Sequence, residues 1–282
     1  MDWWLEPFQL GFQQRALLAG LVAAVMCSTV GVWLVLRGMS FFGDAFVHGV
    51  LPGIAAAVIF GFNPYLGAGV AALIMVGGIE LIHRQTSLKE DTAIGLLFVG
   101  MMALGVAIIS RSSTFTGSLT AILFGDIFGV TEDTLASMMI LGSLIIVGAA
   151  LLYRPLLALS FSPAKAQSLG MRPRLTHAAL LVLIATAVIA SFQAVGTLLV
   201  FGLLVGPPAT AALVSRTVPQ MFGWSLGFSA TSVLLGLVLS YHWQTAGAAT
   251  MALVAIVTFF GVLFAKRGVT VGRQYHQKLG ST

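Results

Sequence analysis

The stretch SFFGDAFVHGVLPG, residues 40–53, decides how the rest of the chain is interpreted. It lies in an apolar run long enough to cross a bilayer, yet it contains Asp44 and His48. An ionisable side chain at that depth costs about 2.5–3.5 kcal/mol on insertion scales, so its presence indicates a function. Residues four apart share one face of a helix, and a carboxylate oxygen with an imidazole nitrogen suits a divalent first-row metal. We therefore predict Asp44 and His48 as metal ligands; the alternative is an Asp–His hydrogen bond that holds two helices together.

The same stretch contains backbone features that favour an ion path. Pro52 has no N–H to offer the carbonyl four residues earlier, so a continuous helix would leave the His48 carbonyl free beside the two side chains. Gly43, Gly49 and Gly53 leave room for a neighbouring backbone to approach closely.

The composition is typical of a membrane protein. Of its 282 residues, 58% are hydrophobic and only 8% are charged, and the mean hydropathy is +1.01. A soluble domain carries about 25% charged residues. Cys27 is the only cysteine, which excludes an internal disulfide and a thiolate cluster. The N-terminal segment has no basic cluster, so we expect the first span to act as an uncleaved signal.

Cutting the chain at charges, prolines and polar clusters predicts an all-α polytopic membrane protein with nine spans, each of about 20 residues. The segment 112–131 is less apolar and is predicted as a partly embedded or interfacial helix. With the C-terminus in the cytoplasm and the N-terminus outside, twelve basic residues fall inside and only Arg15 and Arg111 fall outside. The net charge of +5 is thereby explained by topology, and no nucleic-acid partner is needed. The predicted spans are 16–36, 39–60, 64–82, 92–110, 134–153, 175–192, 195–215, 219–241 and 246–265, followed by a cytoplasmic tail at 266–282.

The largest cytoplasmic connection, 154–174, is predicted to contain its own short helix. Ser162 is a typical N-cap, Pro163 suits the first helical position, and Gly170 suits the residue after the helix. The helix 163–169 serves either as a tight connector or as a docking element for a cytoplasmic partner. Its separate start and stop signals favour docking.

The predicted seventh span contains a second interruption. Gly206, Pro207 and Pro208 lie inside it, and the two prolines remove the N–H partners of the Leu203 and Leu204 carbonyls. Broken spans with freed carbonyls commonly line transport pathways, although a kink that serves packing alone explains the pattern equally well.

Several catalytic patterns do not occur. The chain has no G-x-x-x-x-G-K-[ST] and no H-E-x-x-H. The sequence therefore offers no P-loop or zincin site, and it has no long soluble region that could supply one. We interpret the chain as the membrane part of a transporter, not as an enzyme.

These segments together resemble the permease subunit of bacterial zinc/manganese-type ABC importers. The resemblance is spread over most of the chain, in the order of the family. It is carried by LRGMSFFGDAFVHGVLPG (36–53), KEDTAIGLLF (89–98), LTAILFGDIFGVTEDTL (119–135), SPAKAQSLGM (162–171) and QAVGTLLVFGLLVGPPATA (193–211).

The resemblance implies a homodimer in the bacterial plasma membrane that works with two cytoplasmic ATPase subunits and an extracytoplasmic metal-binding protein. It places Asp44 and His48 on the metal path, and no permanently bound cofactor is expected. It also implies that 163–169 docks on the ATPase, with Pro163, Ala164, Lys165, Ala166, Leu169 and Gly170 as coupling residues. Pro52, Gly206, Pro207 and Pro208 are the expected pathway or kink residues.

The chain departs from the family pattern at two places. The docking segment begins Ser162-Pro163-Ala164, whereas the family usually has Asp-Pro-Glu. The turn at 241–248, YHWQTAGA, lacks the acidic residue that often precedes the last span.

An oxygen–nitrogen ligand pair suits zinc, manganese and iron(II) alike. We expect zinc as the transported ion, with manganese or iron as alternatives. The rival function is a standalone secondary carrier or channel for a divalent metal. An intramembrane enzyme that uses Asp44 and His48 as acid and base ranks far lower, because no third polar group at that depth supports it.

Overall fold

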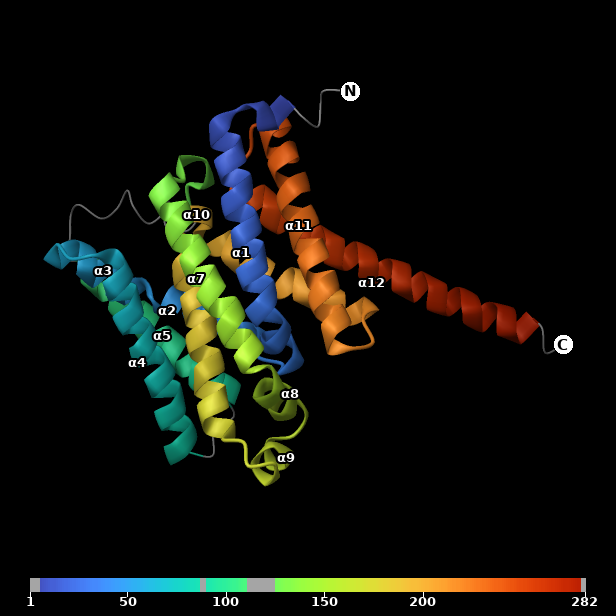
Figure 1. Ribbon diagram of the computed structural model, residues 1–282, viewed down its shortest axis with the longest axis horizontal. Helices are drawn as coiled ribbons and strands as arrows, with labels where there is room; N and C mark the ends of the chain where they lie inside the picture. The colour runs from blue at the N-terminus through green and yellow to red at the C-terminus, as the bar shows by residue number, and fades with distance from the viewer. Residues whose placement is uncertain (1–5, 87–89, 111–124, 280–282) are drawn as a thin grey trace.

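The computed structural model describes residues 6–86, 90–110 and 125–279, and within these ranges every regular element is a helix. The prediction of an all-α membrane protein is confirmed (Figure 1). The α-helices are α1 (Gly11–Leu36), α2 (Ser40–Gly49), α3 (Leu51–Phe60), α4 (Pro64–Gln85), α5 (Glu90–Ile109), α7 (Glu132–Leu151), α8 (Tyr153–Phe161), α9 (Pro163–Ser168), α10 (Pro173–Val214), α11 (Val218–Trp243) and α12 (Gly247–Leu279). Two short 3-10 helices, η1 (Glu6–Gln9) and η2 (Ile127–Gly129), accompany them.

Nine segments of the described chain are long and apolar enough to cross a membrane, which confirms the predicted number. Each overlaps a predicted span and ends within a few residues of it. The first span begins at Gly11, five residues earlier than the predicted 16. The orientation, with the N-terminus outside, stays a prediction. Most of the interfacial helix predicted at 112–131 lies outside the described residues.

Helix α1 lies at the centre of the bundle, where it packs against α10, α11 and α7 (Figure 1). Small residues make this packing close. At Gly31 the α1 backbone lies directly against the Leu204 carbonyl of α10, and an added Cβ there would lie 2.9 Å from Pro208. In lipid, helices associate through such packing because burial of apolar surface gives little driving force there.

Helix α10 comprises two spans, Pro173–Phe192 and Ala194–Val214, joined by a break at Gly196. Gly196 has φ 76°, a conformation that a residue with a Cβ rarely adopts. The backbone of Gly125 packs against this break so closely that an added Cβ at Gly125 would lie 2.6 Å from the Gly196 Cα. The break lies one residue beyond the predicted connection between the sixth and seventh spans, at 192–195.

Two helices extend beyond what the sequence predicts. Helix α8 occupies the first part of the connection 154–174, between the end of α7 and α9. Helix α12 continues to Leu279, past the end of the ninth span, and projects from the bundle (Figure 1). The short helix α9 lies at the end of the bundle opposite the N-terminus (Figure 1).

Candidate metal-binding site and coupling surface

Asp44 and His48 lie one turn apart on α2, as the spacing predicts. The Asp44 Oδ1 and His48 Nε2 atoms are 3.6 Å apart, and the side chains are 35% and 25% exposed. This separation exceeds a hydrogen bond. Both residues belong to one helix, so the pair does not hold two helices together. Two donor atoms that face an accessible surface without bonding each other are available to an ion.

The other face of α2 fixes the orientation of this pair. Phe42 and Phe46 are buried in the core, with ring centroids 5.3 Å apart. At Gly43 the helix meets the side chain of Leu204 from α10, and an added Cβ would lie 2.7 Å from it. Because these contacts anchor one face, Asp44 and His48 must occupy the half-exposed face.

An aromatic side chain from α5 completes the local surroundings. The ring of Phe98 lies 6.2 Å, centroid to centroid, from His48 and 6.0 Å from Phe41. Phe98 could not be singled out from the sequence, because an aromatic residue in an apolar span is ordinary packing until the fold places it beside His48. Its ring limits the directions from which the imidazole can be approached.

A single chain offers an incomplete ligand set. Among the described residues, no group of three or more His, Cys, Asp or Glu side chains lies close enough to hold a metal ion. Tetrahedral and octahedral metal ions need four or more ligands in total. If Asp44 and His48 bind a metal ion, as predicted, these two residues alone would not complete its coordination sphere.

The backbone beside the site differs from one expectation. The carbonyl of His48 is not free, because the helix ends at Gly49 and the N–H of Val50 donates to that carbonyl. Helix α3 then restarts, with Pro52 in its first turn. Proline therefore produces a break between two helices, and the chain closes the lost hydrogen bond locally.

The glycines of this segment admit close neighbours, as predicted. At Gly53 of α3 the backbone lies against the Gly67 carbonyl of α4, and at Gly67 it lies against the Gly53 carbonyl. Gly49 accommodates the Met75 side chain of α4 in the same way. These contacts hold α3 and α4 together as a tight helical hairpin beside α2.

The predicted kink residues Gly206, Pro207 and Pro208 lie in α10 and are buried in the core. The Leu204 carbonyl, which Pro208 deprives of its N–H partner, lies against Gly31 of α1. The helix continues through the two prolines, and its only residue outside the helical conformation is Gly196. A role of Gly206, Pro207 and Pro208 on the ion path stays a prediction.

Helix α9 forms where the sequence predicts it, with the predicted caps. The Ser162 hydroxyl accepts the Lys165 N–H at 3.4 Å. At the other end, Gly170 has φ 73°, and the Met171 N–H donates to the Ala166 carbonyl at 3.1 Å. This is the αL stop that glycine provides at low cost. The helix ends at Ser168, one residue before the predicted end, with Leu169 as its C-cap.

The surface around α9 is suited to a protein contact. Ala164, Lys165, Leu169 and Gly170 are exposed, and Ala166 is buried beneath them. Phe161 at the end of α8 and Leu169 are exposed by 76% and 68% respectively. Phe161 was not predicted, although the 3–4 spacing of apolar residues at 153, 156, 157 and 159 indicates the helix that presents it.

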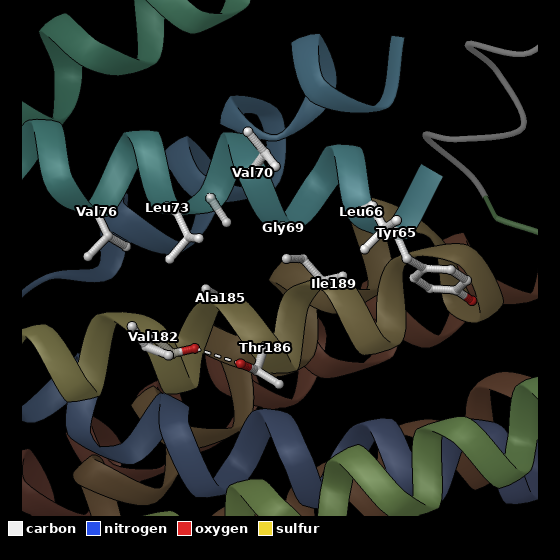
Figure 2. A pocket seen from close by; sticks show the side chains of 11 residues that line it. Tyr65, Leu66, Gly69, Val70, Leu73, Val76, Val182, Ala185, Thr186 and Ile189 are labelled. Carbon is white, nitrogen blue, oxygen red and sulfur yellow. Dashed lines mark hydrogen bonds between the residues drawn. The ribbon is translucent and has the colours of Figure 1, made fainter. Parts of the chain in front are cut away.

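A separate pocket lies between α4 and the first half of α10, with a volume of about 340 Å³ (Figure 2). Leu66, Val70, Leu73 and Val182 are among its apolar lining residues. The Thr186 hydroxyl donates to the Val182 carbonyl at 2.8 Å, which leaves the Tyr65 phenol as the other side-chain oxygen among the lining residues. Neither Asp44 nor His48 lines this pocket, so it is not the candidate ion site.

Comparison with known proteins identifies the family of the chain. Residues 9–266 match the model of the ABC 3 transport family. The chain is 34% identical to the manganese transport system membrane protein MntC of Listeria innocua, over 92% of this chain and 95% of that protein. It is 33% identical to a Haemophilus influenzae protein named "Probable iron transport system membrane protein", with the same coverage. The solved structure of PsaBC from Streptococcus pneumoniae in complex with a Fab contains a chain that superposes with a TM-score of 0.81 at 33% identity, over 92% of this chain and 94% of that chain. The chain therefore belongs to the ABC 3 transport family, and its resemblance to the permeases of bacterial metal importers is confirmed.

Proposed function

We propose that this chain is the membrane permease of an ATP-driven manganese importer, with iron(II) as the second candidate ion. The observation that carries the proposal is the Asp44–His48 pair, two partly exposed side chains 3.6 Å apart within the candidate membrane span Ser40–Phe60. The family supports it as well, because relatives over 92% of the chain are named for manganese and iron transport. Zinc, which we expected from the sequence, has no support among these relatives, and manganese takes its place.

The ligand types agree with a manganese carrier. Carboxylate oxygen suits Mn²⁺, and imidazole nitrogen adds affinity for divalent first-row ions in general. Two protein ligands per chain bind weakly, and a carrier must release its ion on the other side. We propose that a second copy of the chain brings its own Asp44 and His48 to the same ion, so that a dimer encloses the path.

Transport direction and energy supply are further parts of the proposal. A cytoplasmic ATPase binds at α9 and the exposed Leu169, and an extracytoplasmic metal-binding protein delivers the ion at the other side. ATP binding closes the ATPase pair and moves the two α9 helices, so that access to Asp44 and His48 alternates between the two sides. The permease itself performs no hydrolysis.

The test is metal uptake in proteoliposomes that contain this chain, its ATPase and its metal-binding protein. We expect Mn²⁺ uptake that requires ATP and that falls at least about tenfold in His48→Ala and Asp44→Asn, since each change removes one of the two ligands that each chain supplies. Asp133→Asn is the matched control, because Asp133 is an exposed carboxylate in the first turn of α7. Gradient-driven uptake by the chain alone would support the secondary carrier, and wild-type uptake in both site variants would remove the site assignment.

A further inference from the structure

A side-chain hydrogen bond joins the end of α1 to the start of α10. Arg37, the C-cap of α1, lies with its Nη1 atom 2.6 Å from Nδ1 of His177, in a partly buried position. A guanidinium has donors only, so His177 must accept through Nδ1 and carry its proton on Nε2. The contact connects residues 140 positions apart in the sequence.

On one side, Arg37 is tied closely to the helix that carries the proposed metal ligands. The Gly38 and Met39 N–H groups donate to the carbonyls of Val35 and Leu34, at 3.0 Å each. The Phe42 N–H then donates to the Met39 carbonyl at 2.9 Å. An unbroken series of hydrogen bonds therefore runs from the end of α1 into α2, so a shift of Arg37 moves the start of α2.

On the other side, His177 lies close in the chain to α9, the helix proposed to bind the ATPase. The N–H of Met171 donates to Ala166 of α9, and the Thr176 N–H and hydroxyl donate to Arg172 at 3.0 and 3.1 Å. His177 follows Thr176 directly. Met171 and Arg172 are adjacent in the chain, so these two sets of hydrogen bonds leave only one peptide bond between α9 and the first turn of α10.

The end of α1 is also held by the helix that precedes α9. The Trp33 ring of α1 meets the Tyr153 ring of α8 edge to face, with centroids 5.5 Å apart. Elements on both sides of α9 thus contact the last turn of α1. A movement of α9 has a direct mechanical route to α1 and, through Arg37, to α2.

We infer that Arg37 and His177 are positioning residues. They transmit movement of α9 to α2, the helix that carries the proposed metal ligands Asp44 and His48. The inference rests on the proposed function, because it assigns a route between the ATPase surface and the ion site. A hydrogen bond with a charged donor holds the two helix ends in one register more firmly than a neutral one. Without this hydrogen bond, α9 can still bind the ATPase, but a displacement of α9 moves α2 less.

The test compares the amount of Mn²⁺ imported per ATP hydrolysed in the reconstituted complex. His177→Leu removes the acceptor, and Arg37→Met removes the donor. His177→Asn places an amide oxygen near the position of Nδ1 and restores the acceptor. Ser28→Ala is the matched control, since it removes a buried 2.8 Å hydrogen bond between α1 and α11 that lies off this route.

We expect His177→Leu and Arg37→Met each to lower the import ratio about tenfold, the effect of losing one charge-assisted hydrogen bond. The double variant should lose no more than either single variant, because both remove the same contact. His177→Asn should restore most of the ratio, and Ser28→Ala should keep it unchanged.

Other results would overturn the inference. They are a wild-type ratio in the folded single variants, additive losses in the double variant, no rescue by His177→Asn, or an equal loss in Ser28→Ala. Thermal unfolding of each variant separates a transmission defect from misfolding. If the wild-type complex itself imports no metal with ATP, the proposed function fails, and that result is distinct from a failure of the Arg37–His177 route.

Discussion

The reciprocal contact between Gly53 and Gly67 allows a prediction whose sign and size follow from the structure. An added Cβ at Gly53 would overlap the Gly67 carbonyl oxygen and lie 2.7 Å from the Cβ of Ala71. Carbon atoms in contact prefer about 3.5–4.0 Å, so the two helices must separate. The obstacle is backbone, which cannot rotate away as a flexible side chain can. We expect Gly53→Ala to cost about 3 kcal/mol, the upper end of the range for overpacking.

The alanine also brings a gain in helix propensity of about 0.5–1 kcal/mol, which leaves a net loss of about 2 kcal/mol. Gly77→Ala on α4 is the control, because an added Cβ there meets no atom within 4 Å. It should keep or slightly raise stability through the propensity gain alone. The assay is thermal unfolding of the purified chain in one detergent, followed by circular dichroism. Equal melting temperatures for Gly53→Ala and Gly77→Ala would refute the close packing of α3 on α4.

Three further predictions concern other parts of the chain. Cys27 is fully buried with its Sγ 3.8 Å from the Val200 carbonyl, so a maleimide should label it only after unfolding; rapid labelling of the folded protein would contradict the packing of α1 on α10. Gly170→Ala places a residue with a Cβ at a φ of 73°, which costs about 1–2 kcal/mol and should weaken ATPase binding in a pull-down. Ala164→Gly, on the exposed side of α9, should weaken this binding less. Acidification should reduce Mn²⁺ uptake, since the His48 imidazole must be deprotonated to bind metal, and uptake that is independent of pH would argue against His48 as a ligand.

Features that depend on local chemistry followed from the sequence. The number of spans was predictable because crossing a bilayer requires about 20 apolar residues, and charges mark the ends. The caps of α9 were predictable because Ser162, Pro163 and Gly170 each favour a specific backbone conformation. The pairing of Asp44 with His48 on one face required only helical periodicity.

Tertiary structure decided how distant segments meet. The sequence shows that Gly31, Gly53 and Gly67 are small, but only packing shows which backbone each one admits. It shows an arginine at 37 and a histidine at 177, but their hydrogen bond arises from the placement of α1 beside α10. The His48 carbonyl would be free only in a continuous helix, and the chain instead breaks locally between Gly49 and Leu51. Hydropathy and capping act within a few residues along the chain, whereas helix contacts in lipid depend on shape complementarity between surfaces far apart in sequence.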